Sequence, residues 1–223
     1  MLQSRITITS LLLPLLLIIS AGSHAEEATR WYDVEVLLFV QQSKHYRASE
    51  QWPADYTEPQ LNGSRRLLSA ASSSNPVAFS RLGAGDLQLR ADAARIQNAP
   101  DLELLAHFGW RQPGLAQDKA VPIRISEELL NSPARQGELP RLSGTLKLIL
   151  SRYLHIETDL LYREKADGEQ DLFQLAQQQD GSERQHSLYR VYRLEQSRRM
   201  RSGELHYLDH PVFGMAVKVT PHK

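Results

Sequence analysis

Apolar and polar residues alternate over several stretches of the chain, and this period of two is typical of half-buried β-strands. The first stretch runs from Trp31 to Val40, and its β-branched and aromatic residues favour a central strand. The pattern returns over Ser187 to Ser197 and over Val212 to Thr220, which predicts two further strands. A shorter version from Val121 to Ile125 predicts an edge strand.

The longest alternation runs from Leu142 to Arg163 and predicts one long strand, buried on one face and polar on the other. Its apolar residues share one parity. The other parity is polar and comprises Lys147, Ser151, His155, Glu157 and Asp159. Arg152 and Thr158 interrupt the apolar parity, which marks either a bulge or the ends of the buried section.

Helical spacing appears in three short stretches. Apolar residues three and four apart predict a helix within Gly85 to Asn98, with Asp86 as its N-cap. After a proline, Leu102 to Phe108 reads as a second helical piece that ends at a glycine. Near the C-terminus, Ser202 is placed to cap a short helix over Gly203 to His210.

The order of these elements is strand, helix, strand, strand, short helix, strand, which is the split βαβ arrangement of a ferredoxin-like fold. We therefore expect one α+β domain over residues 26–223, with an antiparallel sheet and helices packed on one face. Two long polar insertions interrupt it. One is a loop-rich excursion at about 41–80, and the other is a Gln-rich hairpin insertion at about 164–186.

Residues 1–25 have the pattern of a secretory signal peptide: Arg5, an apolar run from Ile6 to Ala21, and small residues before Glu26. The alternative is a retained membrane anchor. It is disfavoured because Pro14 interrupts the run, which is shorter than the ~20 residues that a spanning helix needs. We expect a periplasmic protein, with no stable membrane insertion after cleavage.

Composition narrows the classes of function. The chain has 26 basic and 26 acidic residues, and this balance argues against electrostatic binding of nucleic acid or of anionic membranes. It has no cysteine, which excludes disulfides, thiol chemistry and a lipid-modified N-terminal cysteine. Export without disulfides fits the envelope of a Gram-negative bacterium.

The stretch from Leu194 to Gly214 is the richest in functional side chains. On an extended strand, Arg199 and Arg201 would share a face and Arg198 would lie on the other, so a guanidinium pair could clamp a carboxylate. The alternative is a solvated strand whose charges neighbouring glutamates neutralise. The candidate ligand-binding residues are Arg198, Arg199, Arg201, Glu204, Tyr207 and Trp110.

Trp110 has a second interpretation. Tryptophans are mostly buried for structural reasons, so we favour a role in which Trp110 covers a helix end and packs on the core. Trp52 and Tyr56, in the polar excursion, are further aromatic candidates for a groove that faces carbohydrate.

A zinc site is the main catalytic alternative. His206, Asp209 and His210 resemble the H-x-x-E-H arrangement of inverted zinc peptidases, with aspartate in place of glutamate. Aspartate is shorter than the glutamate of such enzymes, and a third ligand would have to come from His155 or Glu157. A capping and hydrogen-bond network is therefore favoured, and we expect neither a metal nor a cofactor.

The block RRMRSGELHYLDHPVFGMAVKV, from Arg198 to Val219, resembles the CsiV family of periplasmic peptidoglycan-binding proteins of Gram-negative bacteria. The segments WYDVEVLLF, HFGWRQP and SRYLHIETDL occur in the family's order, so the resemblance covers nearly all of residues 26–223. It implies a non-enzymatic protein that binds peptidoglycan. It also implies a role in cell-wall synthesis through the outer-membrane lipoprotein activator of a bifunctional, class A penicillin-binding protein.

Three functions of different classes follow. The leading hypothesis is a binding or regulatory module for peptidoglycan, and the second is a zinc-dependent cell-wall hydrolase that uses His206, Asp209 and His210. The third is a purely structural partner protein. Retention on protein-free sacculi separates the first from the third, and metal analysis separates the first from the second.

Overall fold

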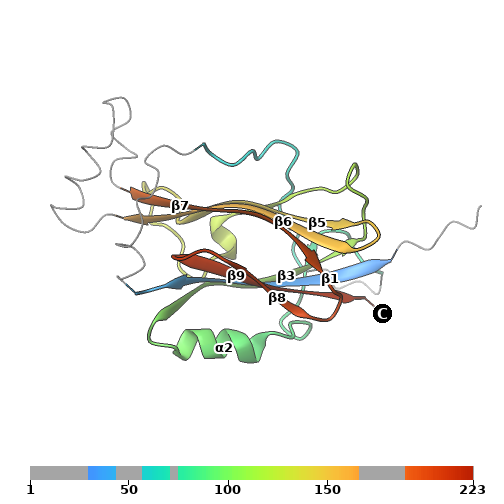
Figure 1. The fold of residues 1–223 in the computed structure, drawn as a ribbon, viewed down its shortest axis with the longest axis horizontal. Coiled ribbons are helices and arrows are strands. Elements are labelled where there is room, and N and C mark those ends of the chain that lie inside the picture. Colours follow the sequence, from blue (N-terminus) through green and yellow to red (C-terminus); the bar gives the residue numbers. More distant parts are fainter. Residues whose placement is uncertain (1–29, 44–56, 71–74, 166–188, 223) are drawn as a thin grey trace, which may run out of the picture.

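The computed structural model describes residues 30–43, 57–70, 75–165 and 189–222. Two antiparallel sheets lie face to face, and a single helix covers the far side of one of them (Figure 1). The described part of the chain is therefore a β-sandwich, and the expected α+β ferredoxin-like fold was wrong. The predicted signal peptide lies outside the described residues. None of the helices in the described ranges is long and apolar enough to cross a membrane.

The first sheet has five strands in the order β2-β3-β1-β9-β8. In chain order they are β1 (Trp31–Gln41), β2 (Ser80–Arg81), β3 (Leu102–Pro113), β8 (Leu205–Asp209) and β9 (Phe213–Pro221). The second sheet has four strands in sequential order. They are β4 (Ile123–Ile125), β5 (Leu142–Leu150), β6 (Leu154–Lys165) and β7 (Tyr189–Met200). The helical elements of the described residues are α2 (Arg90–Asn98) and the 3-10 helix η1 (Glu127–Leu129).

The core lies between the two sheets and is built from the inward residues of both. Its largest fully buried side chains are Trp110 and Phe108 of β3, Tyr192 of β7 and Phe213 of β9. The rings of Phe108 and Trp110 stack with centroids 6.1 Å apart. Burying one such side chain stabilises the folded chain by about 1.5–3 kcal/mol. The apolar residues of the alternating pattern, which form this core, are therefore the main source of the fold's stability.

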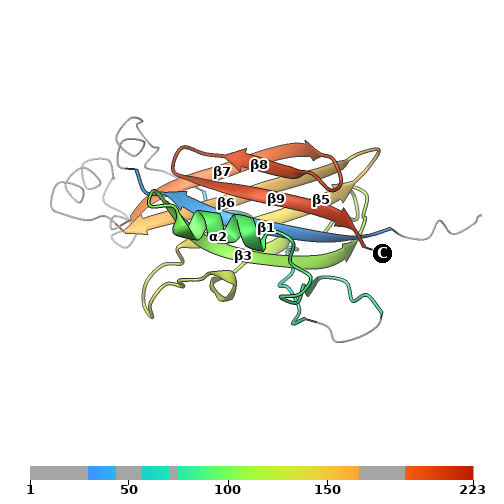
Figure 2. The same cartoon turned by 90° about the horizontal axis from the view of Figure 1, so that it is seen from below.

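Helix α2 packs on the outer face of the five-stranded sheet, where Figure 2 shows it lying across β1 and β3. Its Ala93 and the preceding Leu89 join Leu37, Leu104 and Ala216 in a second, smaller apolar cluster. The outer face of the four-stranded sheet has no such helix in the described part of the chain. Its outward residues include the polar Lys147, Glu157 and Asp159, but also Ile149 and Leu161, which are buried.

Glu35 of β1 fixes the start of α2. Its buried carboxylate accepts hydrogen bonds from the backbone N–H of Gln88 (2.7 Å) and of Leu89 (2.8 Å), and His107 Nε2 lies 2.7 Å from its Oε1. Burial acts to raise the pKa of Glu35, but these hydrogen bonds outweigh it and the pKa is lowered. Asp86, the predicted N-cap, does not cap α2. The N-cap residue of α2 is Leu89, and the carboxylate that accepts from the backbone N–H groups at the start of the helix belongs to Glu35 of β1.

Several predicted elements are confirmed. Strands form at Trp31–Gln41, Ile123–Ile125, Tyr189–Met200 and Phe213–Pro221, and a helix forms at Arg90–Asn98. Of the two predicted insertions, residues 44–56, 71–74 and 166–188 lie outside the described residues.

The predicted helix over Leu102 to Phe108 is wrong, because this segment belongs to β3 and pairs with β1 along its length. A register shift at Leu38/Phe39 leaves Leu105 without a partner residue, and Leu104, Leu105 and Ala106 are all buried. Leu105 and Ala106 belong to the core between the sheets, and Leu104 belongs to the smaller apolar cluster beneath α2. A strand that is buried on both faces loses its alternation and imitates a short helix.

The predicted helix over Gly203 to His210 is also wrong. A turn with Gly203 at φ +83° leads into β8, which pairs with β9 from Leu205 to Asp209. Ser202 is not a cap, because its hydroxyl donates to the carbonyl of Val219 at 3.4 Å. The two missing helices account for the incorrect fold class.

The predicted strand from Leu142 to Arg163 is a hairpin of two strands. The chain turns at Ser151 to Tyr153, where the backbone N–H of Ser151 donates to the carbonyl of Tyr153 at 3.0 Å. The interruption at Arg152 therefore marks the turn. At Thr158 the register is regular, and the buried hydroxyl donates to the carbonyl of Leu194 in β7 at 3.3 Å.

Candidate functional site

Polar side chains predominate on the outer face of the four-stranded sheet across three neighbouring strands, although its outward residues Ile149 and Leu161 are buried. Inward positions of β5 and β6 carry the apolar residues of the core, so the intervening residues point outward. Residues directly opposite on adjacent strands share a face, as Thr145, Asp159 and Glu195 do. We define the polar face as Thr145, Lys147, His155, Glu157, Asp159, Arg193, Glu195, Ser197 and Arg199.

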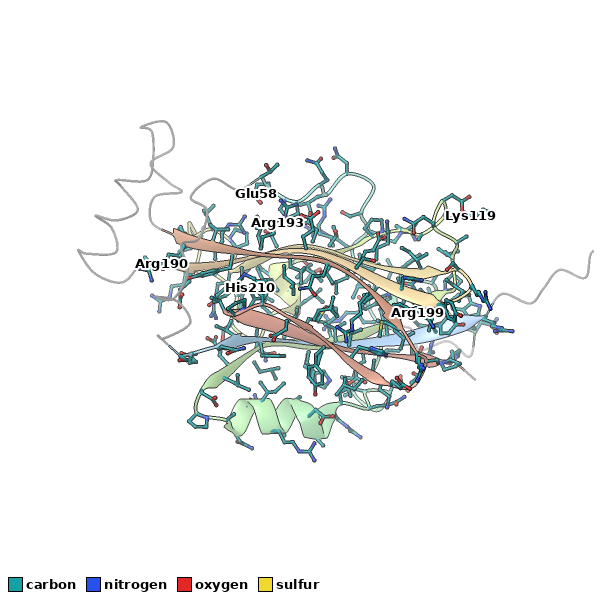
Figure 3. The ribbon with its side chains drawn as sticks, viewed as in Figure 1. Glu58, Lys119, Arg190, Arg193, Arg199 and His210 are labelled. Atoms are coloured by element: carbon teal, nitrogen blue, oxygen red, sulfur yellow. The ribbon has the colours of Figure 1, made fainter. Side chains whose placement is uncertain are left out.

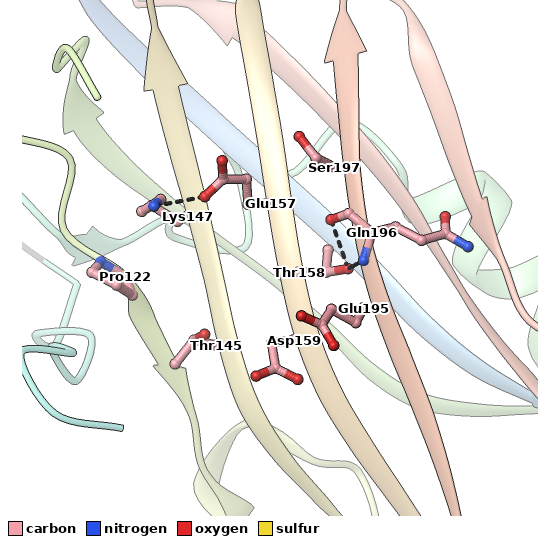
Figure 4. Close-up of a pocket in the computed structure, with 9 residues that line it drawn as sticks. All are labelled: Pro122, Thr145, Lys147, Glu157, Thr158, Asp159, Glu195, Gln196 and Ser197. Atoms are coloured by element: carbon pink, nitrogen blue, oxygen red, sulfur yellow. Dashed lines mark hydrogen bonds and ion pairs between the residues drawn. The ribbon is translucent and has the colours of Figure 1, made fainter. Parts of the chain in front are cut away.

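A groove of about 360 Å³ lies in this polar face, and Figure 4 shows the carboxylates of Glu157, Asp159 and Glu195 along it. The side chain of Gln196 turns away from the groove, and its Nε2 donates to the carbonyl of Asp209 at 3.0 Å. The residues that line the groove are Pro122, Thr145, Lys147, Glu157, Thr158, Asp159, Glu195, Gln196 and Ser197.

The charges of the groove are paired across strands. Lys147 Nζ lies 2.6 Å from Glu157 Oε2. Arg193 donates from Nε and Nη2 to the two oxygens of Asp159 at 2.9 and 3.1 Å, and its Nη2 lies 3.2 Å from Glu195 Oε2. The hydrogen bond that Arg193 donates to Asp159 raises the pKa of Arg193, against the smaller effect of burial. These pairs are partly exposed, so they hold the side chains in place while leaving oxygen atoms open to a ligand.

A cation–π stack adjoins the groove. Arg199, directly across from His155, places its Cζ 3.6 Å from the ring centroid of Tyr153, and Arg152 Cζ lies 5.6 Å from the same centroid. Tyr153 is 39% exposed. No carboxylate of the described residues forms an ion pair with Arg152 or Arg199. The stack therefore presents guanidinium N–H groups to solvent in a fixed orientation.

The structure separates the arginines that the sequence grouped. Arg199 lies on the polar face, whereas Arg198 lies opposite Ile156 and therefore on the other face of β7. Strand β7 ends at Met200, so Arg201 belongs to the following turn and faces Glu204 at 3.7 Å. The extended strand that would place Arg199 and Arg201 on one face therefore does not reach Arg201.

Two aromatic candidates lie apart from these arginines. Tyr207 is on edge strand β8 of the five-stranded sheet and is 54% exposed. Trp110 is fully buried, and its indole N–H donates to Gln112 Oε1 at 2.7 Å. Trp110 therefore has no surface with which to contact a ligand, as the core interpretation of this residue implies. Trp52 and Tyr56 lie outside the described residues.

The proposed zinc ligands do not share a helix face, because His206 and Asp209 belong to strand β8. His206 Nε2 accepts a hydrogen bond from the backbone N–H of Arg201 at 3.1 Å, and His210 Nδ1 accepts one from Val212 at 3.1 Å. Burial lowers the pKa of His210, against a smaller opposing effect of Asp209. No group of three or more potential ligands gathers around a common point within the described ranges.

His210 instead belongs to an aromatic cluster between the two sheets (Figure 3). Its ring lies 6.0 Å from Tyr192 of one sheet and 5.2 Å from Phe213 of the other. The proposed third ligands, His155 and Glu157, lie on the polar face, where Glu157 pairs with Lys147.

The groove residues were missed as a site, although the sequence carried a signal for them. Alternation over β5 and β6 identified Lys147, Glu157 and Asp159 as one polar face. It did not show that a third strand, with Arg193 and Glu195, completes that face. The pairing of β6 with β7 brings Glu195 opposite Asp159, although the two residues are far apart in the sequence.

The sequence model of a family described as "Peptidoglycan-binding protein, CsiV" matches residues 10–222. The chain belongs to the CsiV family. The match covers nearly the whole chain, so the resemblance found in the sequence is confirmed. No curated protein and no solved structure matches the chain. CsiV proteins are peptidoglycan-binding by their description, and the polar face of this member carries a groove.

Proposed function

We propose that this CsiV protein is a non-enzymatic peptidoglycan-binding protein of the periplasm, and that it binds the polymer through the polar face. The observation that carries the proposal is the family match over residues 10–222. The groove and its neighbouring arginine–tyrosine stack support the choice of surface.

The chemistry of the polar face suits the polymer. Peptidoglycan offers hydroxyls, amides, carboxylates and free amino groups, all of which are recognised by hydrogen bonds. Carboxylates of Glu157 and Asp159 accept from hydroxyls and amines, whereas the guanidinium of Arg199 donates to carboxylates. The charged groove side chains are held by ion pairs with their neighbours, so little of their side-chain entropy is lost when a ligand binds.

A steric substitution tests the surface. Ser197 is exposed and lines the groove, so Ser197→Leu fills the groove without removing an ion pair. Ala94→Leu is the matched control, because Ala94 is exposed on α2, which covers the other sheet. We expect the parent and Ala94→Leu to cosediment with protein-free sacculi and Ser197→Leu to stay in the supernatant. Equal sedimentation of all three proteins, each folded by circular dichroism, would exclude the groove.

The proposal includes an absence of hydrolytic activity. We expect sacculi incubated with the purified protein and added zinc to release no soluble fragments above a buffer control. His206→Ala should leave that result unchanged. Release of fragments by the parent that is lost in His206→Ala would overturn the non-enzymatic assignment.

Localisation and partner follow from the same proposal. The pattern of residues 1–25 supports export, and mass analysis of the protein from a periplasmic extract should find Glu26 as its first residue. A chain that keeps residues 1–25 in the membrane fraction would contradict this.

The proposed protein partner is the outer-membrane lipoprotein activator of a class A penicillin-binding protein. Purified activator should bind the immobilised protein without peptidoglycan, and failure to bind would remove this partner.

A further inference from the structure

The polar face has two ends of opposite character. Along β7, Arg199 marks one end and Glu195 the other, with Ser197 between them on the same face. Four residues of an extended strand separate the two side chains by about 13 Å. Figure 3 shows Arg193, the partner of Glu195, and Arg199 at separate positions along β7.

The end near Arg199 is built to receive an anion. Tyr153 holds the guanidiniums of Arg152 and Arg199 with Cζ atoms 5.6 and 3.6 Å from its ring centroid. Stacking occupies the faces of these planar groups and leaves their N–H edges available. Neither arginine forms an ion pair with a carboxylate of the described residues, so a carboxylate of a ligand can supply the complementary charge. A carboxylate that accepts two parallel N–H bonds matches this geometry.

The other end of the groove is built to receive a cation or a hydrogen-bond donor. Three carboxylates, those of Glu157, Asp159 and Glu195, line the groove together with one amine, that of Lys147. Arg193 pairs with Asp159 and Glu195, and both carboxylates stay partly exposed, with side-chain exposures of 23% and 64%. Lys147 and Arg193 do not satisfy all the oxygen atoms of the three carboxylates. This end of the groove therefore favours a ligand with an ammonium group.

The positions of aromatic rings indicate whether the polar face suits the glycan strand or the peptide of peptidoglycan. Sugar rings are usually held against exposed aromatic planes, and no aromatic residue is among those that line the groove. The exposed ring of Tyr153 already carries the guanidinium of Arg199 on its face. The surface therefore suits a charged peptide better than a glycan strand.

We propose that the polar face recognises the stem peptide of peptidoglycan, extended along β7. A carboxylate of the stem binds at Arg152 and Arg199, and the free amino group of its diamino acid binds at Glu157, Asp159 and Glu195. An extended peptide covers about 13 Å with four residues, which is the size of a stem. This inference rests on the proposed function and specifies its ligand.

Three ligands separate the inference from the proposed function. They are intact sacculi, glycan strands stripped of their peptides by an amidase, and a free stem tetrapeptide with an unblocked diamino acid. We expect the purified protein to bind sacculi, to fail to bind stripped glycan, and to be released from sacculi by excess tetrapeptide. Binding of stripped glycan without release by the tetrapeptide would overturn the inference and leave the proposed function standing. No binding to sacculi would overturn both.

Blocked tetrapeptides and substituted proteins then test which charged group of the ligand binds at each end of the polar face. Acetylating the amino group of the tetrapeptide, or amidating its terminal carboxylate, should each weaken binding about tenfold, the range of one charge-assisted hydrogen bond. Glu195→Gln should lose the preference for the free amine, and Arg199→Gln should lose the preference for the free carboxylate. Arg95→Gln and Glu204→Gln are matched exposed controls away from the groove and should keep both preferences. A variant at either end that keeps its preference while folded would overturn the assignment of that end.

Discussion

Replacing Glu35 by glutamine is expected to destabilise the attachment of helix α2 to the five-stranded sheet. The side chain is almost the same size, so the substitution removes charge and one acceptor without opening a cavity. Glu35 Oε2 accepts from the N–H of Gln88, and Oε1 accepts from the N–H of Leu89 and contacts His107. In the variant, an amide NH₂ group must face at least one of these donors.

The magnitude follows from those contacts. A hydrogen bond to a charged group is worth roughly 1.5–3 kcal/mol and a neutral one roughly 0.5–1.5 kcal/mol, so two surviving bonds lose about 1 kcal/mol each. A buried donor left without an acceptor costs about 1–3 kcal/mol more. We expect a total loss of about 3 kcal/mol in the free energy of unfolding. For a protein of this size that lowers Tm by roughly 6–12 °C.

The pH dependence gives a second measurement of the same contacts. The pKa of Glu35 is lowered in the folded protein, so its contribution is present above the ordinary value of 4.5 and is lost as the pH falls through the folded value. The difference in stability between parent and variant should therefore shrink as the pH falls from 7 to 3.

Urea unfolding followed by circular dichroism at each pH measures this difference. Glu204→Gln is the control, since Glu204 is 52% exposed and its loss should change stability by less than about 0.5 kcal/mol. A loss of less than about 0.5 kcal/mol in Glu35→Gln, or a difference that does not change with pH, would show that these hydrogen bonds do not hold α2 in place.

Three further predictions concern the rest of the fold. Gly144 has φ +137°, and a Cβ there would lie 2.0 Å from a backbone oxygen of β6, so Gly144→Ala should cost about 3 kcal/mol or more in urea unfolding. Gly137→Ala, also at positive φ but in open space, should cost about 1 kcal/mol and serves as its control. Trp110→Phe should lose about 1–3 kcal/mol, because Gln112 Oε1 keeps no indole donor, while binding to sacculi stays unchanged. Burial lowers the pKa of His210, so protonation favours the unfolded chain, and the parent should lose Tm between pH 7 and 5 more steeply than His210→Ala.

Strands with one polar face were predictable from the sequence, because their period of two depends only on which side meets the core. The outward positions Lys147, Glu157 and Asp159 followed from this pattern, and they now line the groove. Strand β3 was not predictable in the same way. It is buried against the core on one side and α2 on the other, and its bulge places three buried residues in a row.

The candidate site was only partly predictable for a related reason. Arg199 was identified from its residue type. Its partner Tyr153 was missed, because it lies in the turn of the β5–β6 hairpin, which the alternating pattern predicted as one strand. Arg201 and Tyr207 were grouped with Arg199 because they are close in sequence. The turn after Met200 separates them, since β8 joins the other sheet. Pairing between distant strands, which local patterns do not specify, decides which side chains meet.

Chemical-shift mapping of the ¹⁵N-labelled protein with a soluble disaccharide tetrapeptide tests most directly whether the polar face is the peptidoglycan site. We predict that the perturbed amides cluster on the outer side of β5, β6 and β7, at Lys147, Glu157, Ser197 and Arg199. The amides of α2 should not respond. Perturbations confined to α2 or to Tyr207 on β8, with β5 to β7 unchanged at saturating ligand, would contradict it.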